Sequence, residues 1–240
     1  MKYPISFFFP AYNEKDNIQK LYDDATNVLK EVASEYEILF VVYEGSTDGT
    51  IDTIKKLVDS DAHVRLIIQP KQKKGVGYAI KMGFDFAKHP YIFYADSDNQ
   101  FDLKEFKLFL PYMETHQVIA GYRINRQDPF LRIFTSKVYN IIIRMMFGTR
   151  ERDVDCAFRL VHKDVFEKVT LRCFLGLGTS ELLVKARKYG FKIKEVGVHH
   201  LPRYAGVSVF EAEGIALPKP KVVVDLIKEM QVLKRDLRRK

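Results

Sequence analysis

Short apolar runs alternate along the first hundred residues with longer stretches in which apolar side chains recur at helical spacing. The apolar runs predict strands at residues 5–9, 37–42, 64–68 and 91–95. A helical pattern follows each of the first three, and Asn13 is expected to cap the first helix. This order predicts an α/β fold, with a mostly parallel central sheet and helices on both faces.

The second half of the chain has a less regular pattern. Asp102 is expected to cap a helix that ends or kinks near Pro111. The remaining predicted elements are a strand at 118–122, a long amphipathic segment at 130–147, a helix at 178–189 and a strand at 191–198.

Polar residues follow the apolar strand at 91–95 without a break. Asp96, Asp98 and Gln100 offer carboxylate and amide oxygens, which suit Mg²⁺ or Mn²⁺, and such an ion can hold a diphosphate. The alternative is that Asp98 and Asn99 are only turn residues. The polar loops after the first two strands should share the same sheet edge, where open α/β sheets bind ligands.

Composition narrows the class of protein further. The chain has 240 residues, is 47% hydrophobic and carries a net charge of +8. It contains no apolar run near the roughly 18 residues of a membrane span. Because Met1–Pro4 leads directly into a strand, we expect no signal peptide and a cytoplasmic location. Cys156 and Cys173 form no zinc or disulfide pattern and are expected in the core.

The positive charge suggests a polyanionic partner, which can be nucleic acid, anionic lipid or a phosphorylated substrate. Eight Lys and Arg residues lie between Lys219 and Lys240. No nucleic-acid motif is present, and the acidic strand ends oppose nucleic acid as the partner. Gly75, Gly77 and Gly83 do not form a dinucleotide fingerprint, and no P-loop sequence occurs. The basic loop at 71–74 either closes over phosphates or is simply solvated.

Seven short motifs occur in order along nearly the whole chain. They are Pro10–Glu14, Tyr43–Thr50, Lys74–Gly83, Asp96-x-Asp98-x-Gln100, Gly121–Arg123, Arg152–Arg159 and Glu195–Ser208. Together they resemble glycosyltransferase family 2, with a GT-A fold. The resemblance is strongest to the branch that includes dolichyl-phosphate mannosyltransferases and bacterial polyprenyl-phosphate glycosyltransferases.

The resemblance implies a nucleotide sugar as donor and a role for each motif. The nucleotide sugar would be bound by Pro10, Tyr12, Glu14, Tyr43, Glu44, Lys74, Asp96 and Ser97. The metal, Mg²⁺ or Mn²⁺, would be held by Asp96, Asp98 and Gln100. The catalytic set would be Asp98, Arg123, Arg152, Asp153 and Arg203. Residues 1–122 would form the nucleotide-sugar half and 123–210 the acceptor half of one domain, followed by a basic amphipathic helix or tail at 211–240.

The acceptor decides which chemistry is needed. A lipid phosphate, such as a polyprenyl or dolichyl phosphate, is already an anionic nucleophile, so inverting transfer to it needs no general base. A carbohydrate hydroxyl would need one, and Asp153 or Glu181 are the candidates. Arg152 and Asp153 can alternatively form a buried ion pair.

Three positions depart from the family pattern. Tyr43-Glu44 replaces the usual carboxylate pair, Tyr122 replaces a small residue, and Val209 replaces a basic residue. The first departure keeps open a third function, a non-catalytic nucleotide-sugar-binding or scaffold protein.

Two further features have open interpretations. His199 and His200 should point to opposite faces of a strand, so one of them can approach a metal, while a structural role is the alternative. The segment at 130–147 and the basic tail mix apolar with cationic residues, as interfacial helices do. We expect both to form a peripheral membrane-facing side; the alternative is a core helix and a soluble tail.

Overall fold

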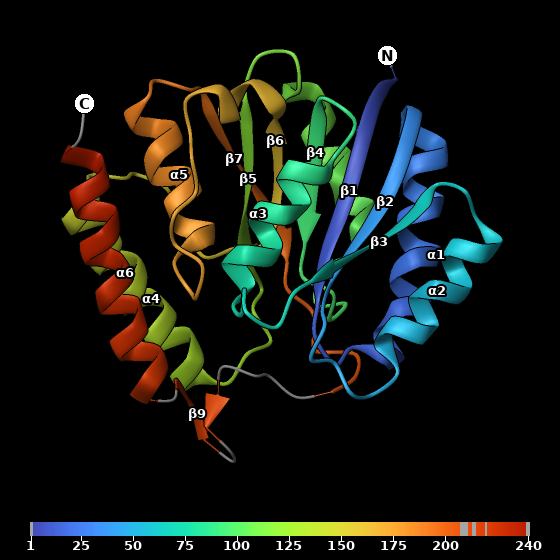
Figure 1. Cartoon of the computed structure of the whole chain (residues 1–240). Helices are drawn as coiled ribbons and strands as arrows, with labels where there is room; N and C mark the ends of the chain where they lie inside the picture. The colour runs from blue at the N-terminus through green and yellow to red at the C-terminus, as the bar shows by residue number, and fades with distance from the viewer. Residues whose placement is uncertain (1, 207–210, 213–214, 219, 239–240) are drawn as a thin grey trace.

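A seven-stranded sheet forms the centre of the protein in the computed structural model, which describes residues 2–206, 211–212, 215–218 and 220–238 (Figure 1). The strand order is β3-β2-β1-β4-β6-β5-β7. β1 pairs in parallel with β2 and β4, as do β2 with β3 and β5 with β7, whereas β6 is antiparallel to β4 and β5. The strands are β1 Tyr3–Ala11, β2 Ala33–Tyr43, β3 Val64–Gln69, β4 Tyr91–Ala95, β5 Val118–Ile124, β6 Phe158–His162 and β7 Ile193–His199.

Helices cover both faces of this sheet, because successive side chains of each strand point to opposite sides. Phe7 and Phe9 of β1 enter the hydrophobic cluster that includes residues of α1, α2 and the 3₁₀ helix η1. Phe8 enters the other cluster, with residues of α3, α5 and α6. The predicted α/β fold, mostly parallel with helices on both faces, is confirmed. The helices are α1 Lys15–Val32, α2 Thr50–Ser60, η1 Leu103–Tyr112, α3 Val76–Phe86, α4 Phe130–Phe147, the 3₁₀ helix η2 Lys163–Glu167, α5 Gly178–Lys188 and α6 Pro220–Arg238.

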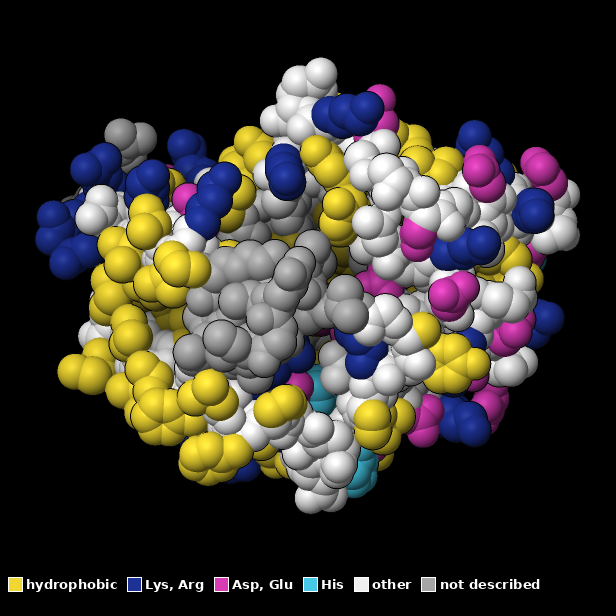
Figure 2. All heavy atoms as spheres, turned by 90° about the horizontal axis from the view of Figure 1, so that it is seen from below, with side chains coloured by type: hydrophobic (Ala, Val, Ile, Leu, Met, Phe, Trp, Pro, Cys, Tyr) yellow, Lys and Arg dark blue, Asp and Glu magenta, His cyan; other side chains and the backbone are white. Residues whose placement is uncertain are grey.

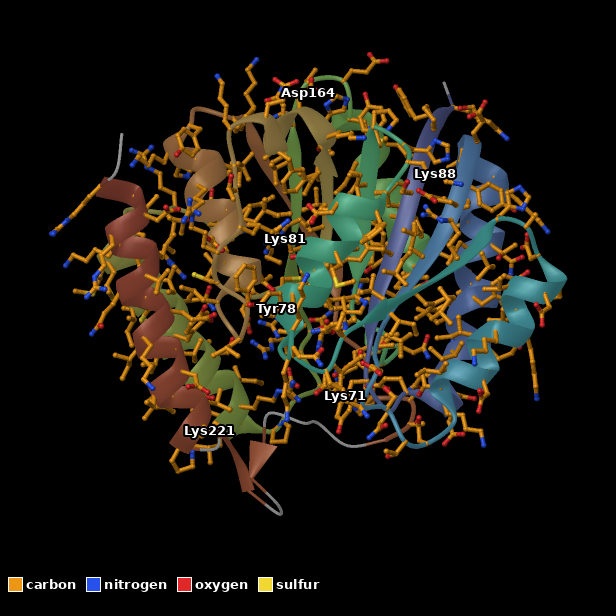
Figure 3. All side chains as sticks on the ribbon, viewed as in Figure 1. Lys71, Tyr78, Lys81, Lys88, Asp164 and Lys221 are labelled. Carbon is orange, nitrogen blue, oxygen red and sulfur yellow. The ribbon has the colours of Figure 1, made fainter. Side chains whose placement is uncertain are left out.

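The carboxyl ends of β1, β2 and β4 meet at one edge of the sheet, as the alternating pattern predicts. Ala11 lies opposite Val42, and Phe8 lies opposite Tyr94. This edge is at the bottom of Figure 3, where Lys71 is labelled, while Lys88 and Asp164 lie at the opposite edge. The loops that follow these three strands are therefore neighbours.

Two local predictions have different outcomes. Asp102 does cap η1, since its carboxylate accepts a hydrogen bond of 3.0 Å from the Lys104 backbone N–H. Asn13 does not cap α1, and that prediction is wrong. Asn13 has a left-handed φ of 54° and accepts a hydrogen bond of 2.8 Å from the Thr47 N–H. Its side chain thus joins two loops instead of closing a helix.

The amphipathic segment at 130–147 and the basic tail both form helices. α4 has the predicted bounds, and α6 occupies most of the basic tail and buries Met230 and Leu233 in the core. No helix within the described residues is both long enough and apolar enough to cross a membrane. A short hairpin of β8 Glu211–Ala212 and β9 Ile215–Pro218 was not predicted. Ser208 and Val209 lie outside the described residues, and the domain boundaries at 122 and 210 remain predictions.

Candidate active site

Hydrogen bonds between the loops hold the carboxyl edge together. The hydroxyl of Ser97 donates to the Pro10 carbonyl at 2.8 Å, which joins the ends of β4 and β1. The Glu14 N–H donates to Thr50 Oγ1 at 2.9 Å, which joins the first loop to the start of α2. Ser97 is buried, so the structure gives its side chain this joining role at the predicted nucleotide-sugar site.

Two carboxylates at the end of β4 interact with each other. Asp98 Oδ1 accepts a hydrogen bond from the Gln100 N–H at 3.1 Å, so the predicted turn does form. Asp96 keeps solvent access although protein atoms crowd around it. This desolvation, together with the charges of Asp98 and Asp155, raises the pKa of Asp96 to about 7. The pKa of Asp98 is also raised by burial, and Arg203 opposes the shift.

Arg203 links this acidic pair to the first loop. Its Nη2 lies 3.1 Å from Asp98 Oδ2, and its Nη1 lies 3.0 Å from Glu14 Oε1. Burial raises the pKa of Glu14, while the charge and hydrogen bonds of Arg203 work against that shift. The family resemblance placed Arg203 in the expected catalytic set; in this structure its guanidinium contacts two carboxylates of the same site.

Arg123 forms the second cation of the site through a bidentate pair with Asp153. Its Nε lies 2.7 Å from Asp153 Oδ2, and its Nη2 lies 2.8 Å from Asp153 Oδ1. Burial acts to raise the pKa of Asp153, but the hydrogen bonds and charge of Arg123 lower it to about 2. The alternative of an Arg152–Asp153 ion pair is therefore wrong. Arg152 instead places its guanidinium over the ring of Tyr122, 4.8 Å from the centroid.

Asp155 was not predicted as a site residue, although it interacts with both Arg123 and Asp96. Its carboxylate is 3.8 Å from Arg123 Nη2, and its charge contributes to the raised pKa of Asp96. Although its side chain keeps solvent access, desolvation by the surrounding protein atoms raises the pKa of Asp155, with Arg123 opposing the shift. The spacing Asp153-x-Asp155 repeats the spacing Asp96-x-Asp98, and this repetition is the signal that could have identified it.

A second missed group surrounds the buried carboxylate of Asp128. Arg126 donates to Asp128 at 2.9 Å, while Arg132 and His200 each lie 3.4 Å from it. Arg126 also donates to Ser136 on α4 at 2.9 Å. Burial lowers the pKa of His200 to about 4 against the pull of Asp128, so this imidazole is neutral at pH 7. Arg132 is thereby held near Asp98, where its charge opposes the rise in the pKa of that carboxyl, while the charge of Arg126 acts on Asp153 and Asp155.

The two adjacent histidines point to opposite sides, as predicted. His200 is buried in the Asp128 group, whereas His199 is exposed. Nδ1 of His199 is hydrogen-bonded to Oε1 of Glu105 at 2.5 Å, and the His199 backbone N–H donates to Oε2 of the same carboxylate at 2.8 Å. The His199 ring thus contacts a carboxylate of η1, while the His200 ring contacts Asp128 and packs edge-on against Phe101 with the ring centroids 5.4 Å apart.

The loops after β1 and β2, which belong to the predicted nucleotide-sugar site, contain an aromatic pair. The rings of Tyr12 and Tyr43 meet edge-on with their centroids 5.6 Å apart, and Tyr12 is 37% exposed. Glu44 Oε2 accepts a hydrogen bond from the Lys71 N–H at 3.1 Å. The glutamate thus supports the basic loop, in which Lys74 is exposed. Tyr43-Glu44 therefore presents a ring and a loop anchor where the family usually has two acids.

The second candidate base, Glu181, and the two cysteines are all buried. Glu181 is completely buried, accepts hydrogen bonds from the Arg172 and Cys173 N–H groups and pairs with Lys185 at 2.5 Å. It is therefore not an accessible base. Cys156 and Cys173 are buried, as predicted, and burial raises the pKa of each thiol.

The chemistry of the acidic pair fits a divalent cation. The described residues contain no group of three or more His, Cys, Asp or Glu side chains arranged to hold a metal ion. Mg²⁺, however, usually takes only one or two carboxylates and completes its shell with water and substrate phosphates. Asp96 and Asp98 repel each other, and a cation would relieve that repulsion. Gln100 donates its amide to the Leu201 carbonyl at 3.1 Å, which ties its side chain to the loop after β7.

Comparison with known proteins now identifies the family. The sequence model described as glycosyl transferase family 2 matches residues 6–170. The chain belongs to this family. The expected family, glycosyltransferase family 2, is confirmed with it.

Curated relatives match most of this chain. It is 27% identical over 208 residues to undecaprenyl-phosphate 4-deoxy-4-formamido-L-arabinose transferase of Yersinia pestis (strain Pestoides F), covering 86% of this chain. The corresponding protein of Salmonella choleraesuis (strain SC-B67) is 26% identical over the same length. The chain spans 62% of the length of these relatives.

Solved structures share the fold. Glucosyl-3-phosphoglycerate synthase from Mycobacterium tuberculosis, in complex with Mn²⁺, UDP and phosphoglyceric acid, superimposes with a TM-score of 0.70 at 14% identity. That match covers 95% of this chain and 78% of the synthase. A complex of the same enzyme with Mg²⁺ and UDP gives a TM-score of 0.68 at 15% identity. The predicted GT-A fold is confirmed.

Proposed function

We propose that this chain is a metal-dependent, inverting glycosyltransferase that moves a hexose from a GDP- or UDP-linked donor to a polyprenyl phosphate. One observation carries the proposal: the Asp96–Asp98 pair at the end of β4 faces the guanidinium groups of Arg123 and Arg203. A site with both signs of charge can take a cation and anionic oxygens together. The names of the curated relatives support the polyprenyl phosphate.

Different residues of the site would bind different parts of the donor. Asp96 and Asp98 would hold Mg²⁺ or Mn²⁺, and the ion, when bound, supplies positive charge for the diphosphate. Tyr12 and Tyr43 would contact the base. The exposed Lys71–Lys74 loop would lie against the phosphates. Preorganised positive charge of this kind stabilises the leaving diphosphate as its bond to the sugar breaks.

The acceptor end favours an anion over a hydroxyl. Asp153 is held by Arg123 with a pKa of about 2, and Glu181 is buried, so neither predicted base is suited to take a proton. A phosphate oxygen needs no deprotonation. It would attack the anomeric carbon while the bond from that carbon to the diphosphate breaks on the opposite side. Arg126 and Arg132, with Arg123, supply the positive charge that such an acceptor needs.

A carbohydrate hydroxyl is the second candidate acceptor, and Asp155 is the observation that favours it. Its side chain is 43% exposed and its pKa is raised. A partly exposed carboxylate of raised pKa beside the reacting groups is a candidate general base. The two acceptors give different products, one extractable into organic solvent and one not.

The lipid acceptor requires a way to reach a membrane surface, which α4 and α6 would provide. Only Asn140 and Ile143 of α4 are buried, and Phe130 and Met145 are more than 80% exposed. Figure 2 shows hydrophobic side chains gathered over one side of the molecule, with Lys and Arg at its margin. The exposed apolar side chains of the two helices are Phe130, Leu131, Phe134, Val138, Ile141, Ile142, Met145, Met146, Val223, Val224, Ile227 and Val232, here named the apolar face.

A transfer assay tests the proposal. Labelled UDP- and GDP-hexoses are offered with Mn²⁺ and undecaprenyl or dolichyl phosphate, and label is measured in the organic extract. We expect transfer from one donor, its loss on chelation, and a decrease of about 100-fold in Asp98→Asn. The matched control is Asp102→Asn, since asparagine caps a helix as well as aspartate. Label that appears only on a carbohydrate acceptor, or no metal dependence, would overturn the proposal.

A further inference from the structure

Glu229 occupies an unusual position for a charged side chain, because it faces the protein and not solvent. It lies on α6, is 7% exposed, and accepts hydrogen bonds from four consecutive backbone N–H groups. Oε1 accepts from Phe174 at 2.5 Å and Leu175 at 2.7 Å, and Oε2 accepts from Gly176 at 3.0 Å and Leu177 at 2.9 Å. One carboxylate therefore fixes the whole segment that leads into α5.

That segment is the support for the start of α3. The Gly77 N–H donates to the Phe174 carbonyl at 2.9 Å, and the rings of Tyr78 and Phe174 stack with their centroids 3.9 Å apart. A Cβ at position 77 would lie 2.4 Å from the Cys173 carbonyl oxygen, so the two backbones are in direct contact. The backbone at Gly77 therefore packs directly on residues 173–174, which support the end of the 71–77 loop.

Gln69 and Glu44 hold the basic loop from its other side. Gln69 Nε2 donates to the carbonyls of Lys73 and, at 2.8 Å, Gly75, while Glu44 accepts from the Lys71 N–H. Figure 3 shows Lys71 and Lys221, the latter near the start of α6, at the same edge of the molecule, with Tyr78 above that edge. The loop thus lies between β3 and a segment whose position depends on α6.

We infer that Glu229 is a positioning residue of the donor site: it holds residues 174–177, and through them the loop at 71–77 that faces the donor phosphates. This inference rests on the proposed function, because that function makes the loop a phosphate contact. Glu229 itself does not touch the donor. Losing its carboxylate would leave four N–H groups of the segment without their acceptor and would free the loop.

Kinetics and hydrogen exchange of Glu229→Gln test the inference. The amide keeps the shape of the side chain but has only one oxygen, so it cannot accept from all four N–H groups. We expect faster backbone exchange at both 174–177 and 71–78. The KM for the nucleotide sugar should rise about tenfold, with kcat changing much less, because the loop binds the donor.

Two variants of α6 serve as controls. Asp225→Asn removes an equal charge from the same helix and should change neither exchange nor KM. Leu233→Ala removes core packing of α6 without touching Glu229, and should lower Tm without faster exchange at 71–78. If Leu233→Ala raises exchange and KM as Glu229→Gln does at a similar loss of Tm, the role of Glu229 is only structural. Unchanged exchange at 71–78 in Glu229→Gln also overturns the inference.

A variant of α3 weakens the contact between the start of α3 and residues 173–177 without changing Glu229. Tyr78→Leu removes the stack on Phe174 and leaves Glu229 intact, so it applies even where Glu229→Gln does not fold. It should raise the KM for the donor in the same way, and an unchanged KM would overturn the inference. If the parent chain transfers no sugar, the proposed function fails, while exchange at 71–78 still decides whether Glu229 positions the loop.

Discussion

Arg203, on the loop after β7, forms an ion pair of 3.1 Å with Asp98 at the end of β4. The same guanidinium contacts Glu14 after β1, so one side chain joins three loops of the carboxyl edge. Both carboxylates lie in positions that burial makes unfavourable for charge, and Arg203 offsets that cost. Arg203 therefore both organises the site and supplies it with positive charge.

Replacing Arg203 by lysine should break the bridge between Glu14 and Asp98. A single ammonium cannot present two nitrogens in a fixed fork to Glu14 and Asp98, although it keeps the charge. We expect kcat/KM for sugar transfer to decrease by about 100-fold in Arg203→Lys. The matched control is Arg187→Lys, which changes an arginine of α5 that is paired with Glu151. Equal activity of the two variants would show that the bridge is dispensable.

The pair of Arg123 and Asp153 predicts how stability depends on pH. The pKa of Asp153 is about 2 in the folded protein and ordinarily 3.8. A lowered folded pKa stabilises the protein fully above pH 3.8, and this contribution is lost as the pH falls towards 2. It amounts to about 2 kcal/mol at pH 7.

Urea unfolding of Asp153→Asn measures that contribution. The variant should be less stable than the parent by at least about 2 kcal/mol at pH 7, and the difference should shrink as the pH falls from about 4 to about 2. Asp52→Asn serves as the control, because Asp52 is 78% exposed at the side chain. A difference that is independent of pH would show that Asp153 acts through shape and not through its charge.

The alternating half of the fold follows from the sequence, and the rest depends on long-range contacts. The first four strands are short apolar runs, and a helical pattern follows each of the first three, so they could be predicted. β6 was not predicted, because Phe158-Arg159-Leu160 contains an arginine where a buried strand should be apolar. Arg159 is fully buried because its guanidinium donates to the carbonyls of Val154, Cys156 and Thr179. Those partners come from another turn and from α5, which no local pattern reveals.

The same limit applies to the site. Asp96 and Asp98 could be predicted because they directly follow a strand. The buried position of Asp128 depends on His200, which follows β7, and on Arg126 and Arg132, which lie just before α4 and in its first turn. The family resemblance placed Arg123 and Asp153 in the catalytic set. Their pairing could not be predicted, because it depends on how β5 lies beside the 153–155 turn.

The exposed ring of Tyr12 predicts how the base is held. Aromatic stacking contributes about 1–3 kcal/mol per base and tolerates different bases. Tyr12→Ala should therefore weaken binding of the preferred donor nucleotide by about tenfold in calorimetric titration with Mn²⁺. Tyr12→Phe keeps the ring and should bind like the parent. If Tyr12→Phe is as weak as Tyr12→Ala, the hydroxyl and not the ring makes the contact.

The apolar face predicts binding to anionic vesicles. Fully burying one Phe or Met side chain contributes about 1.5–3 kcal/mol, so losing two should cost about 3 kcal/mol or more. Phe134→Glu combined with Met145→Glu should then reduce vesicle partitioning by about 100-fold in a flotation assay. The matched control changes two exposed apolar residues outside that face, Phe86→Glu with Leu108→Glu. Because the control adds the same negative charge, equal flotation of the two double variants would mean that repulsion alone explains any loss. Flotation that matches the parent in the first variant would exclude α4 as the membrane contact.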